Sequence, residues 1–272
     1  DPGFGYGIHF ADNSGEPAGH AVLYNEIHRA QRHGIYMALG STVLVHGNKI
    51  FDHRDELDDG AVRFALNCSR TQFFVITANQ IIRSHNTSVG IAADAGGICE
   101  HIVFANNEII DPFVNPLFPL PAMEVGLDID TNGQVNDLLI EGNKFSTDAL
   151  INTDALRINW GRRIVVRDNS FEMIGANATT YGINLRGIGE GAGTTDFSDD
   201  WTIQDNSFRI VDGVAVATGA GIRLSPPYID SGIRTTLGGS YGGGRNRFIA
   251  AAEYSLAGTL TNPNVFAWEG TQ

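Results

Sequence analysis

Acidic and basic side chains recur in the middle of this chain, in short segments where polar and apolar residues alternate. Residues 128–130 read Asp-Ile-Asp, residues 157–159 read Arg-Ile-Asn and residues 184–186 read Asn-Leu-Arg. Carboxylates that lie close together repel one another, so such a group needs a bound cation, a neighbouring arginine or a shared proton. These are the ingredients of a catalytic or metal-binding site, although structural charge networks have them as well.

These segments belong to runs in which an apolar residue occupies every second position. Such alternation is typical of a β-strand with one face in a core and the other facing solvent. Sustained helical periodicity is absent, so we expect little helix. The runs cover residues 7–10, 34–37, 61–64, 90–93, 126–129, 155–158, 182–185 and 221–224.

A second phrase recurs between these runs and consists of asparagine, one variable residue and then isoleucine or phenylalanine. Its spacing of roughly 23 to 40 residues lies in the range typical of solenoids. Each repeat should therefore contain at least two short strands. The asparagines are Asn25, Asn48, Asn79, Asn107, Asn143, Asn169, Asn206 and Asn246.

Together the two phrases resemble the right-handed parallel β-helix of the pectate-lyase-like superfamily, most closely its right-handed β-helix repeat members. The resemblance covers nearly the whole chain and implies an all-β solenoid of about eight coils, in one domain over residues 1–272. In that fold, stacked asparagine side chains form hydrogen bonds along the axis at a tight turn. Asparagine also tolerates a left-handed backbone. We therefore interpret the asparagines as structural rather than catalytic.

Alignment of the eight runs by their first apolar residue gives two columns of outward-facing side chains. Neighbouring strands lie about 4.8 Å apart, so we expect Asp94 beside Asp130, with Asp128 one step along the strand. The alternative is a solvated charge ladder. The first column reads His9, Tyr36, Arg63, Ala92, Asp128, Arg157, Asn184 and Arg223, and the second reads Ala11, Ala38, Ala65, Asp94, Asp130, Asn159, Arg186 and Ser225.

One catalytic interpretation of this face is a polysaccharide lyase. Asp94, Asp128 and Asp130 would bind Ca²⁺, a hard cation that prefers oxygen ligands. The ion would neutralise a uronate carboxylate of the substrate and acidify the proton at C5. Arg157 or Arg186 would then remove that proton or stabilise the intermediate. This arrangement is similar to that of pectate lyases, in which aspartates on this face bind calcium and an arginine is the base.

Two other functions remain open on the same residues. In an inverting glycoside hydrolase one aspartate is the general acid and another activates water, with their carboxyl groups about 6.5–9.5 Å apart. Asp128 with Asp130, or Asp94 with Asp128, would suit that distance. A non-catalytic β-helix, as in tailspike shafts and adhesins, would bind glycans or act as a spacer.

Further residues of the two columns are expected to bind the substrate. Aromatic rings that face outward can stack on a sugar. The candidates are Arg63, Asn159, Asn184 and Arg223, with the rings of Tyr36 and His9.

Charge and hydropathy limit the partners and the compartment. The formal net charge is −13, which argues against nucleic acid as a partner, because binding it requires a basic patch. No apolar run of about 18 residues is present, so no segment is expected to span a membrane. By analogy with the fold, we expect a secreted or cell-surface protein. The chain starts almost inside a repeat without a capping segment, which suggests a trimmed form.

Two further features allow more than one interpretation. Cys68 and Cys99 precede the asparagine phrases of adjacent repeats, and both a disulfide and two buried thiols are consistent with that position. The Pro-rich, apolar insertion at 111–124 could form the rim of a groove, a packing cover or the contact of a homo-oligomer.

Overall fold

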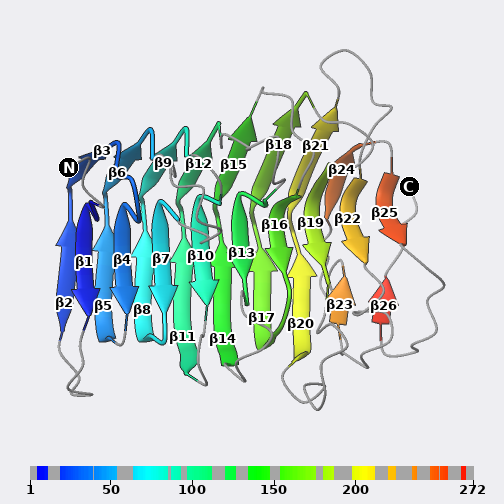
Figure 1. Cartoon of the computed structure of the whole chain (residues 1–272). Coiled ribbons are helices and arrows are strands. Elements are labelled where there is room, and N and C mark those ends of the chain that lie inside the picture. The colour runs from blue at the N-terminus through cyan, green and yellow to red at the C-terminus, as the bar shows by residue number, and fades with distance from the viewer. Residues whose placement is uncertain are drawn as a thin grey trace.

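The protein is a solenoid of parallel β-strands, seen in a computed structural model (Figure 1). The described part of the chain contains no helix of the length and hydrophobicity that crossing a membrane requires. The structure describes residues 5–11, 19–38, 40–53, 64–84, 87–92, 97–111, 120–126, 134–147, 154–175, 180–186, 198–211, 220–224, 235–237, 246–250, 252–256 and 265–267.

The strands form three sheets, and every pairing between neighbouring strands is parallel. Sheet A consists of β1 (Ile8–Ala11), β4 (Ile35–Ala38), β7 (Leu66–Ser69), β10 (Val89–Ala92), β13 (Met123–Val125), β16 (Asp154–Ile158), β19 (Tyr181–Leu185), β22 (Ala220–Leu224) and β25 (Ala252–Leu256). Sheet B consists of β2 (His20–Leu23), β5 (Ser41–His46), β8 (Gln72–Thr77), β11 (Ile98–Ala105), β14 (Gln134–Glu141), β17 (Gly161–Arg167), β20 (Ser198–Gln204), β23 (Thr235–Leu237) and β26 (Val265–Ala267). Sheet C consists of β3 (Glu26–His28), β6 (Lys49–Phe51), β9 (Gln80–Ile82), β12 (Glu108–Ile110), β15 (Lys144–Thr147), β18 (Ser170–Ile174), β21 (Ser207–Val211) and β24 (Arg247–Ile249).

The chain visits the sheets in the order A, B, C and then begins the next coil one strand further along. The predicted all-β, right-handed parallel β-helix is therefore confirmed. Each full coil contains three strands, in agreement with the predicted minimum of two. Sheets A and B each contain nine described strands, one more than the eight predicted repeats, because β25 and β26 belong to a last coil that has no asparagine phrase.

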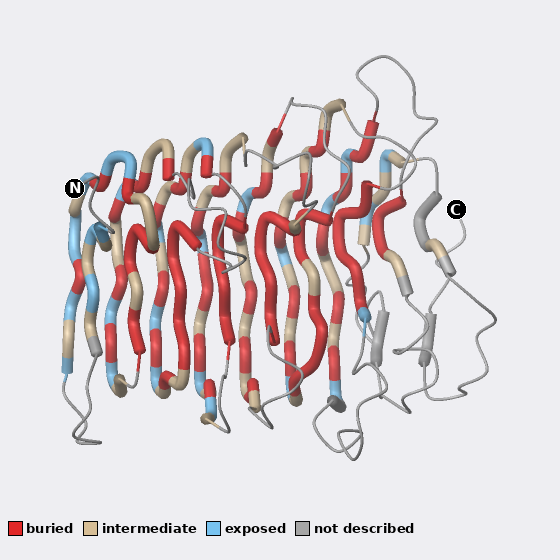
Figure 2. Tube along the Cα trace, viewed as in Figure 1, coloured by how far each residue is buried: buried red, intermediate tan, exposed pale blue. Residues whose placement is uncertain are grey.

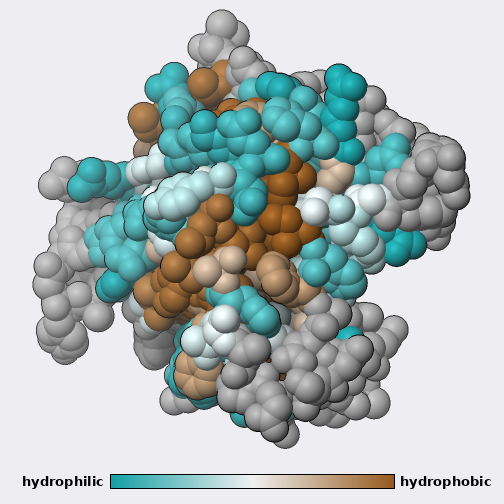
Figure 3. Space-filling model, turned by 90° about the vertical axis from the view of Figure 1, so that its left-hand side faces the viewer, coloured by the Kyte–Doolittle hydropathy of each residue, from teal (hydrophilic) through white to brown (hydrophobic). Residues whose placement is uncertain are grey.

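Buried residues recur along the strands of every coil (Figure 2), and the inward-facing side chains of the three sheets form one continuous core. Identical residues stack on successive rungs, as in the column of four phenylalanine rings with centroids 4.9 Å apart. Seen along the axis from its N-terminal side, the molecule shows a central apolar area ringed by polar side chains (Figure 3). The four rings are Phe145, Phe171, Phe208 and Phe248.

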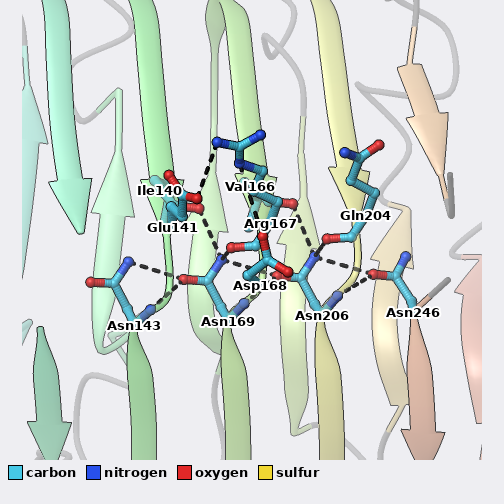
Figure 4. A network of polar contacts seen from close by, with 10 residues as sticks. All are labelled: Ile140, Glu141, Asn143, Val166, Arg167, Asp168, Asn169, Gln204, Asn206 and Asn246. Atoms are coloured by element: carbon cyan, nitrogen blue, oxygen red, sulfur yellow. Dashed lines mark hydrogen bonds and ion pairs between the residues drawn. The ribbon is translucent and has the colours of Figure 1, made fainter. Parts of the chain in front are cut away.

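The eight asparagines form one continuous ladder at the turns between sheets B and C. In each step the backbone N–H and the side-chain amide of one asparagine donate to the Oδ1 of the next, as Asn169 does to Asn206 over 3.0 Å (Figure 4). The left-handed residue is not the asparagine, as we expected, but the residue before it, such as Ala78 with φ 56° and Asp168 with φ 56°. The asparagine thus contributes its side chain to the ladder and leaves the strained turn position to its neighbour.

The sequence alignment is wrong for three strands of sheet A, namely β7, β10 and β13. In place of 61–64 the strand is β7, whose Leu66 and Cys68 continue the core columns of neighbouring strands. In place of 126–129 it is β13, whose Met123 and Val125 pair with β10 and β16. The errors in β7 and β13 have one cause, since a short alternating run next to a long connection fits the pattern in more than one register. In β10 the alignment is out by two residues, because Gly90 rather than Ala92 pairs with Asn67 and Glu124.

The two cysteines are buried thiols that are not joined by a disulfide. Cys68 lies in β7 of sheet A and Cys99 in β11 of sheet B, so they do not stack in one column.

Candidate functional site

The outer face of sheet A is the face that the long connections border. In the first seven coils the chain passes from sheet B to sheet C through the same two-residue turn. The long connections 52–65, 111–122 and 186–197 instead begin or end at sheet A. Long connections in repeat proteins commonly form the wall of a binding site.

Strand pairing defines the outward column of this face without gaps. His9, Tyr36, Arg157, Asn184 and Arg223 lie in it, as the sequence alignment expected. Asn67, Gly90 and Glu124 occupy the places that the alignment gave to Arg63, Ala92 and Asp128, because β7, β10 and β13 are shifted. In order the column reads His9, Tyr36, Asn67, Gly90, Glu124, Arg157, Asn184, Arg223 and Ser255.

Four of the expected site residues, Arg63, Asp94, Asp128 and Asp130, lie outside the described residues. The proposed Ca²⁺ ligands are among them. In the described part of the chain no group of three or more His, Cys, Asp and Glu side chains could hold a metal ion.

In the middle of the column, five polar side chains form what we call the carboxylate cluster. The Arg157 guanidinium lies between two carboxylates, with Nε 2.8 Å from Asp154 Oδ2 and Nη1 3.7 Å from Glu124 Oε1. Asn184 donates to Asp154 Oδ2 over 3.0 Å, and Asn159 donates to Glu124 Oε1 over 2.8 Å. The cluster thereby joins three successive strands, β13, β16 and β19.

The two carboxylates of the cluster are buried although they are on the outer face of the sheet. Glu124 is 6% exposed and Asp154 is 3% exposed. Burial raises the pKa of Glu124 above its ordinary value, while Arg157 and the hydrogen bond from Asn159 act in the opposite direction and Asp154 adds to the rise. Asp154 makes the shorter contact with Arg157. One guanidinium therefore serves two carboxylates in unequal environments, as in acid–base pairs.

Several buried polar atoms near the cluster have no hydrogen-bond partner among the described residues. These include Asn159 Oδ1 and Trp160 Nε1, which follow Arg157 along the chain, and Asn67 Oδ1 in the same column. Native proteins leave few such atoms unsatisfied, and those that remain call for an explanation. The two asparagine oxygens are acceptors and Trp160 Nε1 is a donor, and hydroxyl groups of a ligand could satisfy all three.

Gly126 and Trp160 close the cluster at the end of β13. Gly126 has a positive φ of 74°, and a Cβ atom there would lie 2.8 Å from the Trp160 ring. Its carbonyl accepts a hydrogen bond from Asn159 over 2.8 Å. The contact between the ring and the backbone fixes the chain beside Glu124.

At the N-terminal part of sheet A, aromatic rings gather around the two that the sequence proposed for sugar stacking. His9 lies 4.5 Å from Tyr6 and 5.0 Å from Tyr36, and His33 lies 4.7 Å from Tyr36, all nearly parallel. Arg32 donates to the Tyr6 hydroxyl over 3.1 Å. The rings use much of their faces on one another, so this group offers mainly edges and polar atoms to a ligand.

The other two expected residues lie towards the C-terminal part of the column. The Arg223 guanidinium lies over the Tyr181 ring at 4.7 Å from its centroid. Arg186 is exposed, directly follows β19 and acts electrostatically on Glu124.

Sequence reasoning did not select Glu124, Asp154, Tyr6 or His33. Glu124 was hidden because it ends the insertion 111–124, although Met123 and Val125 on either side give it the alternation of a strand. Asp154 begins β16 and contacts Arg157 three residues later, a proximity that strand alternation alone does not predict.

Comparisons with known proteins yield little beyond the architecture. No family model and no curated protein match the chain. Among solved structures, the chain is similar to the tailspike protein mutant E372A of E. coli bacteriophage HK620 in complex with pentasaccharide, at 12% identity and a TM-score of 0.39. The match covers 78% of this chain and 45% of the tailspike chain, so the chain spans less than half of that protein's length. A similarity at this level gives no argument about activity.

Proposed function

We propose that this protein binds an acidic polysaccharide along the outer face of sheet A and cleaves it at the carboxylate cluster. The observation that carries the proposal is the position of Glu124 and Asp154 on either side of Arg157, in one column bordered by long connections. Arginines further along the column, Arg223 and the neighbouring Arg186, supply positive charge for an anionic chain. Such a substrate implies that the protein acts outside the cell or at its surface.

Hydrolysis is the chemistry that the described residues favour. Glu124, with its raised pKa, would donate a proton to the glycosidic oxygen, and Asp154 would accept a proton from the attacking water. Both carboxylates contact one guanidinium group, which is compatible with the separation of about 6.5–9.5 Å that inverting enzymes use. Arg157 would orient both groups, and the unpartnered Asn159 Oδ1 would accept a hydrogen bond from a sugar hydroxyl.

Elimination is the second candidate, and the exposed position of Arg186 favours it. Arg157 is held between carboxylates, which suits an orienting cation better than a base. Arg186 would therefore be the base, with Ca²⁺ bound by Asp94, Asp128 and Asp130 to neutralise the uronate. A calcium requirement would separate this mechanism from hydrolysis.

The test is an assay on a panel of acidic polysaccharides with Ca²⁺ and with EDTA. New reducing ends without unsaturated products would support hydrolysis, whereas ultraviolet absorbance of an unsaturated uronate that EDTA abolishes would support elimination. Glu124→Gln should abolish hydrolysis, and Glu108→Gln, the same change on the outer face of sheet C, should leave it unchanged. If no glycan is cleaved, the cleavage proposal fails, and glycan binding by the wild type would then identify a non-catalytic binder.

A further inference from the structure

The outer face of sheet B carries an unbroken row of aliphatic side chains, which we call the sheet B stripe. The strand register aligns its members across six neighbouring strands, from β2 to β17. Near its N-terminal end, Leu44 is 38% exposed and Val75 is 40% exposed. The stripe consists of Ala21, Leu44, Val75, Val103, Leu139 and Val165.

The stripe is unusual among the three outer faces. The corresponding column of sheet C starts with Glu26, Lys49 and Gln80, and that of sheet A is mostly polar. Of the seven most exposed large hydrophobic side chains in the described residues, only Ile249 is not on or next to sheet B. An exposed apolar surface of this kind typically marks an interaction site.

Charged side chains of alternating sign border the stripe on both sides. On one side Asp137 of β14 forms an ion pair with Arg163 of β17, and His101 and Asp200 lie on the strands before and after them. On the other side Glu141 of β14 lies 3.0 Å from Arg167 of β17. Each border thus has an acid on β14 and a base on β17, near the middle of the nine-stranded sheet.

We propose that the sheet B stripe is the interface with a second copy of this chain, packed face to face with the two solenoid axes antiparallel. A two-fold axis parallel to the strands, passing between β14 and β17, would place Leu139 opposite Val165 of the second copy. The same operation places Asp137 opposite Arg163, and Glu141 opposite Arg167, between the copies. A two-fold interface requires such self-complementarity.

The opposite orientation of the second copy is disfavoured by charge. If the two axes were parallel and the strands in register, Asp137 would face Glu141 and Arg163 would face Arg167. Like charges across an interface are repulsive. The antiparallel arrangement also places His101 opposite Asp200, since β11 then faces β20.

The length and area of the facing surface match a second solenoid. The two-fold operation brings eight strands of sheet B, β5 to β26, opposite the second copy. At about 4.8 Å each they cover about 38 Å, and a strip about 15 Å wide would bury roughly 1,150 Å² over both copies. That area lies at the lower end of the range for stable interfaces. A short peptide would cover only part of this length. The oligomer contact predicted at 111–124 lies mostly outside the described residues, and this surface is independent of it.

The test is the oligomeric state of the full chain by analytical ultracentrifugation over a range of concentrations. We expect a concentration-dependent dimer for the wild type. Leu139→Glu should weaken the dimer at least tenfold, whereas Ile249→Glu, an equivalent change on sheet C, should have no effect. A wild type that is monomeric throughout the range would overturn the proposal.

A charge swap tests the antiparallel geometry and does not depend on a substitution in the stripe. Arg163 is exposed, so Arg163→Glu should fold normally, which circular dichroism would verify, and it should weaken the dimer by placing like charges opposite Asp137. The double variant Asp137→Arg/Arg163→Glu restores opposite charges within and between copies and should recover the dimer. A dimer that is insensitive to both Leu139→Glu and Arg163→Glu, in folded protein, would also overturn the proposal.

Discussion

Replacement of one asparagine in the middle of the ladder should destabilise the whole solenoid. The Asn169 side chain donates from Nδ2 to Ile140 O and Arg167 O, both over 2.9 Å, and to Asn206 Oδ1 over 3.0 Å. Its Oδ1 accepts from the backbone and the side chain of Asn143, over 2.9 and 3.0 Å (Figure 4). The residue is only 1% exposed, so water cannot easily replace these contacts.

The expected magnitude for Asn169→Ala follows from these contacts. Each hydrogen bond contributes about 1 kcal/mol net, and a buried donor or acceptor without a partner costs about 1–3 kcal/mol. Several buried groups of Asn143, Asn206 and the strand ends would lose a partner together, so we expect a loss of about 3–6 kcal/mol in the free energy of unfolding. Because a solenoid is stabilised by contacts between neighbouring coils, a break in the middle should also reduce its cooperativity.

Urea denaturation followed by far-ultraviolet circular dichroism measures this loss, with Asn25→Ala as the matched control. Asn25 is the first asparagine of the ladder and is half-buried, and its Nδ2 donates only to Leu23 O and Asn48 Oδ1. Water can replace these contacts, so the control should lose about 1 kcal/mol or less. Equal losses for the two variants, or a loss below about 1 kcal/mol for Asn169→Ala, would refute the assignment of stability to the buried ladder.

Three further predictions concern buried groups. Burial raises the pKa of Glu124 in the folded state, so folding favours the protonated form of this side chain. The resulting contribution to stability is present below the unfolded-state pKa and is lost as the pH rises through the folded-state pKa. The stability of the wild type relative to Glu124→Gln should therefore fall between acidic and neutral pH in urea titrations, and a constant difference would contradict the raised pKa. Cys68 and Cys99 are buried and not joined by a disulfide, and burial raises the pKa of Cys68. A thiol reagent should therefore label neither cysteine in the native protein and both in denaturant. Rapid labelling of the native protein would show instead that the thiols are accessible. Phe171→Ala should cost about 3–5 kcal/mol, because its ring is buried and stacked on both sides. Phe248→Ala, in a half-buried position with one stacked neighbour among the described residues, should cost less. Equal shifts of the two denaturation midpoints would contradict a contribution from the stack.

The architecture could be predicted because it is repeated. Eight asparagine phrases give eight independent observations of one turn, so a chance match at a single phrase has little influence. Asn79 and Asn107, for example, mark the same corner in neighbouring coils and bond directly over 2.9 Å. The last coil, with β25 and β26, was missed because it lacks the phrase that identifies the others.

The candidate site could be predicted only in part because it depends on register. Arg157 and Asn184 were aligned correctly, since the connections that precede their strands, 148–153 and 175–180, are short. Glu124 was not, because the long connection before β13 leaves the strand free to slide by several residues in any alignment of the sequence. A shift of that size moves one acidic residue out of the column and another into it, so the identity of a single catalytic carboxylate can change while the fold remains the same.

A difference between the corners of the coil explains why the sheet A face should carry the chemistry. In the first seven coils the asparagine ladder accompanies a turn of two residues between sheets B and C. The long connections 52–65, 111–122 and 186–197 of those coils lie at the other two corners, both of which border sheet A. The column from Asn67 to Arg223 is thus bordered by connections whose length and composition can change at little cost to the core. Sheet B, with the ladder along one edge, keeps a regular surface that suits a partner of equal regularity.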